Sequence, residues 1–114
     1  MGQQENEILQ QLLVFRHERD WVQFHSPRSL AISISVEAAE LLEHFQWLKD
    51  DEPPSPEKNE GVSEEIADIY IYLLLMAHDL GIDLIPSALK KIEANRQKYP
   101  IDKAKGTARK YKPF

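Results

Sequence analysis

The chain has 114 residues, a formal net charge of −5 at pH 7, 42% hydrophobic residues and no cysteine. This length corresponds to one domain, and the lack of cysteine excludes disulfides, thiolate metal sites and cysteine nucleophiles. The N-terminal residues lack the regions of a secretory signal, and the longest apolar run, 69–77, is shorter than the roughly 18 residues that a membrane span needs. We expect a soluble, cytoplasmic protein with no membrane partner.

Charge is distributed unevenly along the chain. Residues 101–114 carry five basic side chains and one acidic side chain, a net of +4, so residues 1–100 hold −9. An acidic body disfavours a nucleic-acid duplex as a partner. The basic tail suits a small polyphosphate ligand, and it is equally consistent with a solvated tail. We expect one helical domain over residues 1–100 and an irregular basic tail over 101–114.

Hydrophobic spacing predicts four helices and no strand. The first helix covers about 5–22. One of its sides carries residues in helical period: Ile8, Leu12, Phe15 and Arg19. The second helix runs from about 27 to 48, with Ser26 as its N-cap and Pro27 at its first position.

A polar, proline-containing loop separates the second helix from the third. The third helix covers about 56–80, with Ser55 as N-cap and with Gly81 placed to end it in a left-handed conformation. The fourth helix covers about 84–99 behind Asp83 as a candidate cap. The fold class predicted from this pattern is all-α.

The third predicted helix is apolar nearly all round. Its apolar side chains follow one another almost without interruption: Ile66, Ile69, Tyr70, Ile71, Tyr72, Leu73, Leu74, Leu75 and Met76. Such a helix must be covered on several sides, and three other helices give little cover. We therefore expect a homo-oligomer, a dimer or a dimer of dimers. The alternative is the central helix of a compact single-chain bundle.

Two acidic motifs are the candidate site for chemistry. Glu37 and Glu40 stand three residues apart on the second predicted helix, and Glu65 and Asp68 stand three apart on the third. On a helix this spacing places both side chains of a pair on one face. Four converging carboxylates would repel one another, and a hard divalent cation bound by oxygens, most simply Mg²⁺, removes that repulsion. The alternative is surface charge that happens to share this spacing.

Two further side chains lie close to these motifs in sequence. Glu64 stands four residues before Asp68 and is placed to reach the same site. His44 stands four residues after Glu40 on the same stripe, as a neighbour or core residue rather than a ligand. The sequence leaves open whether either side chain contributes to metal binding.

These motifs resemble those of the MazG-like all-α nucleotide pyrophosphohydrolases, and most closely the small dCTP pyrophosphatase branch. The segments that carry the resemblance are Arg19-Asp20-Trp21, His25-Ser26-Pro27-Arg28, Glu37-Ala38-Ala39-Glu40, Phe45-Gln46-Trp47, residues 64–73 and Asn95-Arg96-Gln97-Lys98-Tyr99-Pro100. The resemblance implies a four-helix MazG-like bundle. It also implies that Glu37, Glu40, Glu65 and Asp68 bind Mg²⁺ and are catalytic. His44 departs from the branch, which usually has an aliphatic residue there.

The resemblance also implies substrate-binding residues. Trp21 and Trp47 are expected on opposite sides of a nucleobase, with His25 and Tyr72 in the same pocket. Aromatic rings stack on any base, whereas hydrogen bonds discriminate among bases.

Three residues of the fourth predicted helix are candidates for the triphosphate: Lys91, Asn95 and Arg96. The guanidinium of Arg96 suits bidentate phosphate contact, and a polar surface stripe explains Arg96 equally well.

Together, the residues and the resemblance predict an Mg²⁺-dependent nucleoside triphosphate pyrophosphohydrolase. It would release a nucleoside monophosphate and pyrophosphate from a dNTP such as dCTP, in housecleaning of the nucleotide pool. Two alternatives remain at this point, a di-metal carboxylate bundle and a non-catalytic helical interaction module.

Overall fold

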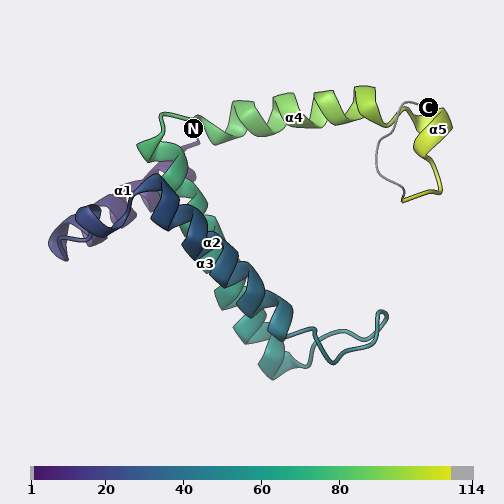
Figure 1. Ribbon diagram of the computed structural model, residues 1–114, viewed down its shortest axis with the longest axis horizontal. Coiled ribbons are helices and arrows are strands. Elements are labelled where there is room, and N and C mark those ends of the chain that lie inside the picture. Colours follow the sequence, from purple (N-terminus) through teal and green to yellow (C-terminus); the bar gives the residue numbers. More distant parts are fainter. Residues whose placement is uncertain (1, 109–114) are drawn as a thin grey trace. The chain divides into compact units, whose positions relative to one another are not determined.

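The computed structural model describes residues 2–108, which contain helices and no strand (Figure 1). The elements are α1 (Gln3–Glu18), a 3₁₀ turn (Val22–Phe24), α2 (Pro27–Glu43), α3 (Pro56–Asp79), α4 (Leu84–Lys98) and α5 (Ile101–Ala104). The predicted all-α fold class is confirmed. Three basic residues of the predicted tail, Arg109, Lys110 and Lys112, lie outside the described residues.

Both predicted serine caps are present. The Ser26 hydroxyl oxygen accepts a hydrogen bond from the Ser29 backbone N–H at 3.1 Å, and the Ser55 hydroxyl accepts one from the Lys58 N–H at 3.2 Å. Each bond satisfies one of the N–H groups that a helix start leaves without an intrahelical partner. A proline follows each cap at the start of the helix, where its missing N–H costs nothing. These local signals define where α2 and α3 begin.

Helix ends agree less closely with the prediction. Gly81 has φ 68°, so the left-handed end of α3 is confirmed. α1 ends at Glu18 and not near residue 22, because Asp20 adopts a positive φ of 53° that leaves the helix. α2 ends at Glu43, about one turn before the predicted end. Asp83 precedes α4 as predicted, but its side chain makes no capping hydrogen bond.

The tail contains one short helix that the sequence analysis did not predict. α5 occupies Ile101–Ala104, directly after Pro100, whose φ of −59° is compatible with a helix start. The expectation of an irregular tail is therefore wrong for these four residues.

The chain divides into two compact units, Met1–Ile82 and Asp83–Phe114. The first unit holds α1, α2 and α3, and the second holds α4 and α5. This division falls inside the range 1–100 that we expect to form one domain. That expectation stays a prediction.

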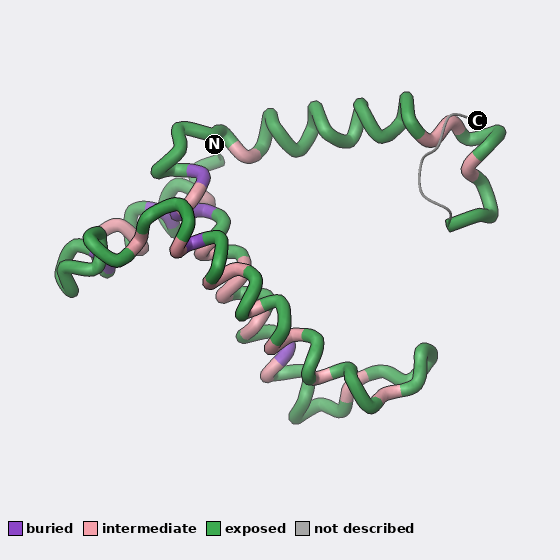
Figure 2. The backbone as a smooth tube through the Cα atoms, viewed as in Figure 1, coloured by how far each residue is buried: buried purple, intermediate pink, exposed green. Residues whose placement is uncertain are grey.

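In the first unit α3 is the central element. α2 runs alongside α3 and α1 packs against α3 (Figure 1). The buried apolar side chains come from all three helices: Leu9, Leu30, Val62, Leu74, Leu75 and Ala77. Most of them lie where the three helices meet (Figure 2). Full burial of one such leucine side chain stabilises the fold by roughly 1.5–3 kcal/mol.

The buried side of α1 differs from the predicted one. Leu9 and Arg16 are buried, whereas the predicted Ile8 and Phe15 are 38% and 44% exposed. The two buried residues stand seven apart, which is two helical turns, so they share a face. An arginine on this face was not expected, because an unpaired buried charge is costly.

Asp79, at the end of α3, is the partner that makes this burial possible. Arg16 Nη1 donates to Asp79 Oδ2 at 2.8 Å, and Arg16 Nη2 donates to Asp79 Oδ1 at 2.9 Å. This bidentate geometry is the strong form of the arginine–carboxylate pair. The pKa of Asp79 is lowered, chiefly by the hydrogen bonds from Arg16. The pair ties α1 to α3.

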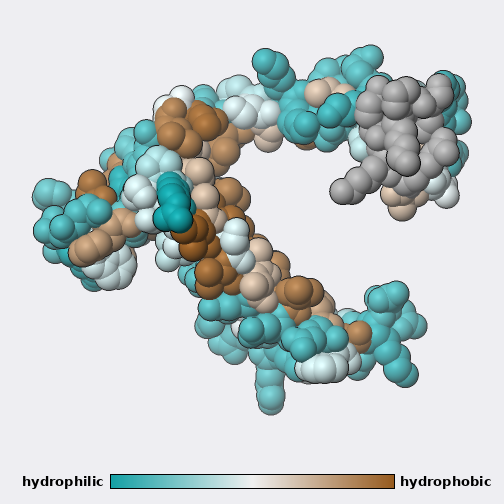
Figure 3. All heavy atoms as spheres, viewed as in Figure 1, coloured by the Kyte–Doolittle hydropathy of each residue, from teal (hydrophilic) through white to brown (hydrophobic). Residues whose placement is uncertain are grey.

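The α2–α3 pair leaves an apolar surface uncovered (Figure 3). On α3 the residues Ile66, Tyr70 and Leu73 are 53%, 39% and 41% exposed, and on α2 the residues Ile32 and Val36 are 48% and 50% exposed. The spacing within each set is three or four residues, so each forms a stripe along its helix. α1 and α2 therefore cover only part of the circumference of α3.

Among residues 2–108, no single helix is both long enough and apolar enough to cross a membrane. The pair α3 and α4 meets that test jointly, by length and composition alone.

Candidate metal centre and aromatic cavity

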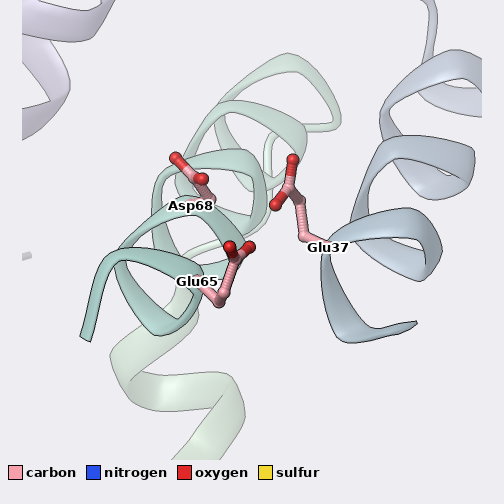
Figure 4. Close-up of side chains that lie close together, drawn as sticks. All are labelled: Glu37, Glu65 and Asp68. Atoms are coloured by element: carbon pink, nitrogen blue, oxygen red, sulfur yellow. The ribbon is translucent and has the colours of Figure 1, made fainter. Parts of the chain in front are cut away.

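Three of the four predicted acids converge between α2 and α3. Glu37 projects from α2 toward Glu65 and Asp68 on α3, and one carboxylate oxygen of each lies within 4.8 Å of the others (Figure 4). The three-residue spacing brings Glu65 and Asp68 to one face of α3. The packing of α2 along α3 then brings Glu37 opposite them. All three side chains are half-buried.

Glu40 lies beside this cluster and outside the set of three. The pKa of Glu37 is raised to about 7, first by burial, then by hydrogen bonding to Glu65 and Glu40, and then by the charges of Glu40 and Asp68. A hydrogen bond between two carboxyl groups requires a proton on one of them. Without a cation, the site therefore retains a proton that an isolated glutamate would lose.

The donor set fits a hard divalent cation. Glu37 Oε2 and Glu65 Oε2 are buried and have no hydrogen-bond partner among residues 2–108. Buried carboxylate oxygens without a partner are costly, and a cation bound to them removes that cost together with the mutual repulsion. An all-oxygen set from carboxylates is typical of Mg²⁺ or Mn²⁺ sites. Glu37, Glu65 and Asp68 are the residues that would hold the ion.

His44 contacts this cluster through Glu65. Its Nε2 lies 3.9 Å from Glu65 Oε1, and the two side chains are 27% and 17% exposed. Gly61 provides the space for the ring, since a Cβ at position 61 would lie 2.7 Å from His44 Cε1. His44 is therefore a neighbour of one candidate ligand. Glu64, the other residue left open by the sequence, is exposed.

A second group of predicted residues meets in a small cavity of about 70 Å³. Its walls come from α1, α3 and the segment between α1 and α2: Leu12, Phe15, Arg16, Trp21, His25, Ile71, Tyr72 and Leu75. The rings of Trp21 and His25 are 6.2 Å apart, and those of His25 and Tyr72 are 6.5 Å apart, both edge-to-face. Three of the predicted base-binding residues thus share one aromatic site.

Tyr72 connects the cavity to the acidic cluster. Its pKa is raised by burial first and then by the negative charges of Glu37 and Asp68, while a hydrogen bond with Ser33 lowers it. These charges act on the phenol because Tyr72 stands one helical turn after Asp68 on α3. One ligand that spans the two sites would place an aromatic ring in the cavity and a charged group near the acids.

Several cavity residues were not among the predicted site residues, and Arg16 is the most informative of them. It is 6% exposed, and its Nε is buried without a hydrogen-bond partner among residues 2–108. The available signal was the spacing of Leu9 and Arg16, which places a charged residue on the apolar side of α1. Its partner Asp79 is 63 residues away in sequence, so no local pattern joins them.

Trp47 is not part of this cavity in one copy of the chain. It follows the end of α2 and is 84% exposed, whereas Trp21 precedes the start of α2 and lines the cavity. The 17 residues of α2 span about 25 Å at 1.5 Å per residue. A single copy therefore does not hold one base between Trp21 and Trp47, which corrects that expectation. A role for Trp47 stays a prediction that requires a second copy.

The predicted phosphate-binding residues Lys91, Asn95 and Arg96 all lie on α4, in the second unit, and are exposed. Arg96 Nη1 donates to Glu93 Oε2 at 2.9 Å. The phosphate-binding role of these residues stays a prediction.

Comparison with known proteins identifies the family. The MazG-like family model matches residues 32–114, which include both acidic motifs. The chain therefore belongs to the MazG-like family, and its all-α structure is a MazG-like fold.

Curated relatives carry a more specific name. The chain is 43% identical to dCTP pyrophosphatase 1 of Bos taurus and 42% identical to that of Homo sapiens, over 101 residues in each case. These alignments cover 85% of the chain and 60% and 59% of the relatives, so the chain spans about three fifths of their length.

A solved structure gives the same picture. The fold matches that of a pyrophosphatase from Archaeoglobus fulgidus with a TM-score of 0.73 and 39% identity. The match covers 88% of this chain and 95% of the archaeal one.

The contact between Gly61 and His44 leads to a stability prediction. Gly61→Ala favours the helix by up to about 1 kcal/mol but places a methyl group against the His44 ring. We expect Gly61→Ala to stabilise the His44→Ala variant and to stabilise the wild type less, or to destabilise it. Urea denaturation measures the effect of Gly61→Ala on the free energy of unfolding in both backgrounds. We expect the two effects to differ by about 1 kcal/mol. Equal effects in the two backgrounds would contradict the contact.

The raised pKa of Glu37 leads to a prediction about pH. Because the pKa is about 7 in the folded chain against an ordinary 4.5, ionisation of Glu37 opposes folding increasingly from pH 4.5 upward and fully above pH 7. We expect Glu37→Gln to increase the free energy of unfolding of the metal-free protein at pH 8, with a smaller gain at pH 5. Urea denaturation in EDTA checks this, with exposed Glu64→Gln as control. A gain that is independent of pH would contradict it.

Proposed function

We propose that this chain hydrolyses a nucleoside triphosphate between its α- and β-phosphates, releasing a nucleoside monophosphate and pyrophosphate. Its preferred substrate is a dNTP, with dCTP first because the curated relatives are named for it. The observation that carries this proposal is the cluster of Glu37, Glu65 and Asp68 beside an aromatic cavity. The housecleaning role predicted from the sequence belongs to the same proposal.

The acidic cluster suits phosphoanhydride hydrolysis that depends on Mg²⁺. A bound Mg²⁺ would neutralise phosphate charge and lower the pKa of an attacking water. Glu37, Glu65 and Asp68, with Glu40 beside them, would hold the ion. One glutamate of this site, a metal ligand or its neighbour, would accept the proton from the water.

The cavity suits the nucleobase. Trp21, His25 and Tyr72 offer ring surfaces, and stacking on an aromatic is worth about 1–3 kcal/mol per base. Its volume of about 70 Å³ is well below the roughly 300–1,000 Å³ of typical ligand pockets. One copy of the chain therefore supplies only part of a nucleotide site. Lys91, Asn95 and Arg96 are the proposed phosphate-binding residues.

A homo-oligomer, a dimer or a dimer of dimers, would complete the site. The exposed stripes on α2 and α3 defined above are apolar surfaces that a second copy would bury. Trp47, with most of its indole exposed, would cover the cavity of the second copy. This arrangement restores the proposed base contact of Trp47, which one copy does not form.

The activity is tested by pyrophosphate release from all common dNTPs and NTPs in Mg²⁺. We expect Glu37→Ala, Glu65→Ala and Asp68→Ala each to lower turnover at least about 100-fold, equivalent to about 2.7 kcal/mol. Glu40→Ala is expected to do the same, because Glu40 lies beside Glu37 in this site. Exposed Glu64→Ala, next to Glu65 on α3, is the matched control and should keep near-normal turnover.

Near-normal turnover in two or more of the four cluster variants at saturating Mg²⁺ would contradict the assignment. No pyrophosphate from any nucleotide in the wild type would indicate a non-catalytic helical module.

The assembly is tested by sedimentation at micromolar concentration. We expect a mass well above the 13.2 kDa of one chain, because the exposed apolar stripes favour association. Ile66→Glu, within the α3 stripe, should shift the distribution toward the monomer. Val14→Glu changes an equally exposed apolar residue of α1, outside the stripes, and should leave the mass unchanged. A monodisperse wild-type monomer would overturn the proposed homo-oligomer.

A further inference from the structure

Two residues of the aromatic cavity wall each have a buried side-chain nitrogen atom without a hydrogen-bond partner among residues 2–108. The two atoms are Arg16 Nε and His25 Nδ1. Both side chains line the cavity, together with Trp21 and Tyr72. A buried polar atom without a partner costs roughly 1–3 kcal/mol, so each atom favours a ligand that supplies the missing bond. The residues of the cavity wall therefore offer two unused hydrogen-bonding atoms as well as aromatic rings.

Arg16 is held rigidly by its partner. Two terminal nitrogens donate to Asp79 at 2.8 and 2.9 Å, which fixes the guanidinium plane. The Nε–H group is not used by this pair, and guanidinium can only donate. The side chain is 8% exposed, so water has little access to it. Arg16, a residue of the cavity wall, thus has one fixed, charge-assisted donor that no described residue uses.

His25 supplies a hydrogen-bond acceptor, which complements the donor of Arg16. Burial and the nearby charge of Arg16 lower its pKa, which favours the neutral imidazole. In a neutral imidazole with its proton on Nε2, Nδ1 is a hydrogen-bond acceptor. Edge-to-face contacts with Trp21 and Tyr72 hold the ring in place. A donor and an acceptor are therefore present in one small cavity.

We propose that Arg16 is a base-selecting residue that, with His25, reads the edge of an aminopyrimidine. Arg16 Nε donates to the ring nitrogen N3 of cytosine, and His25 Nδ1 accepts from the adjacent amino group. Thymine has the reverse pattern, a donor at N3 beside a carbonyl acceptor, and leaves both protein atoms unsatisfied. A site built around such bonds strongly rejects a ligand that lacks them. The inference rests on the proposed function, because it places the nucleobase of the substrate in this cavity.

Arg16→Lys tests this role. Lysine keeps the positive charge and a partner for Asp79 but has no counterpart of the Nε–H group. We expect the preference for dCMP over dTMP, measured as a ratio of dissociation constants by titration calorimetry, to fall about 10- to 100-fold. Binding of 2-deoxyribose 5-phosphate, which has no base, should change little. Arg28→Lys, an exposed arginine on α2, is the matched control.

A purely structural role for Arg16 predicts a different pattern. All three ligands would weaken together, the melting temperature would fall, and the dCMP to dTMP ratio would stay constant, which would overturn the inference. If Arg16→Lys does not fold, the paired change of Arg16→Met with Asp79→Leu replaces the ion pair by apolar side chains of similar size. Loss of the preference in this folded variant supports the inference, and its retention overturns it.

The outcome is separable from that of the proposed function. Pyrophosphate release by the wild type with an unchanged ratio in Arg16→Lys overturns the base-selecting role alone. A wild type that prefers dCMP, and loses this preference in Arg16→Lys, supports the role even where no nucleotide is hydrolysed. A wild type that binds none of the three ligands overturns the base-selecting role, and pyrophosphate release then decides the proposed function independently.

Discussion

The repulsion between carboxylates across the α2–α3 contact is the constraint on which the rest of the first unit depends. Packing α2 along α3 buries apolar surface and, in the same step, brings Glu37 against Glu65 and Asp68. Burial first, and then hydrogen bonding to and the charges of the neighbouring acids, raise the pKa of Glu37 to about 7. Hydrophobic burial holds the acids together, and their proximity costs stability that a bound cation would restore.

A single stripe of α3 joins the acidic cluster to the cavity. Its residues follow one another at intervals of three or four: Glu65, Asp68, Tyr72, Leu75 and Asp79. The first two belong to the cation site, the next two line the aromatic cavity, and the last fixes Arg16. A rigid helix sets the order of these groups along about 20 Å at 1.5 Å per residue. Charge at one end and ring surface at the other suit a nucleotide, which has its phosphates and its base at opposite ends.

The same helix explains why we propose an assembly. Burial by α1 and α2 covers one side of α3 and leaves Ile66, Tyr70 and Leu73 at the surface. In one copy the aromatic cavity also lacks Trp47, the second proposed base contact, because Trp47 lies at the other end of α2 from Trp21. Contact with another copy would cover the exposed apolar stripes. The same contact would bring Trp47 to the cavity.

Local chemistry in the sequence was sufficient for the fold class, the two serine caps, the left-handed end of α3 and the acid pairs. These features depend on residues within one or two helical turns, where spacing and backbone preference act directly. Helix ends were less accurate, because tertiary contacts and turns such as that at Asp20 override weak propensities. Of the side of α1 marked by its apolar spacing, Leu12 and Phe15 line the cavity, while the fully buried residues are Leu9 and Arg16.

Only the tertiary structure decided which side chains act together. It brought oxygens of Glu37, Glu65 and Asp68 within 4.8 Å of one another and set Glu40 beside Glu37. It paired Arg16 with Asp79 and placed Trp47 away from Trp21. Such choices depend on how two helices rotate and slide against each other, and a shift of one residue turns a helical side chain by about 100°. Sequence spacing defines a face of one helix, but the packing of a neighbouring helix determines which groups on that face meet a partner.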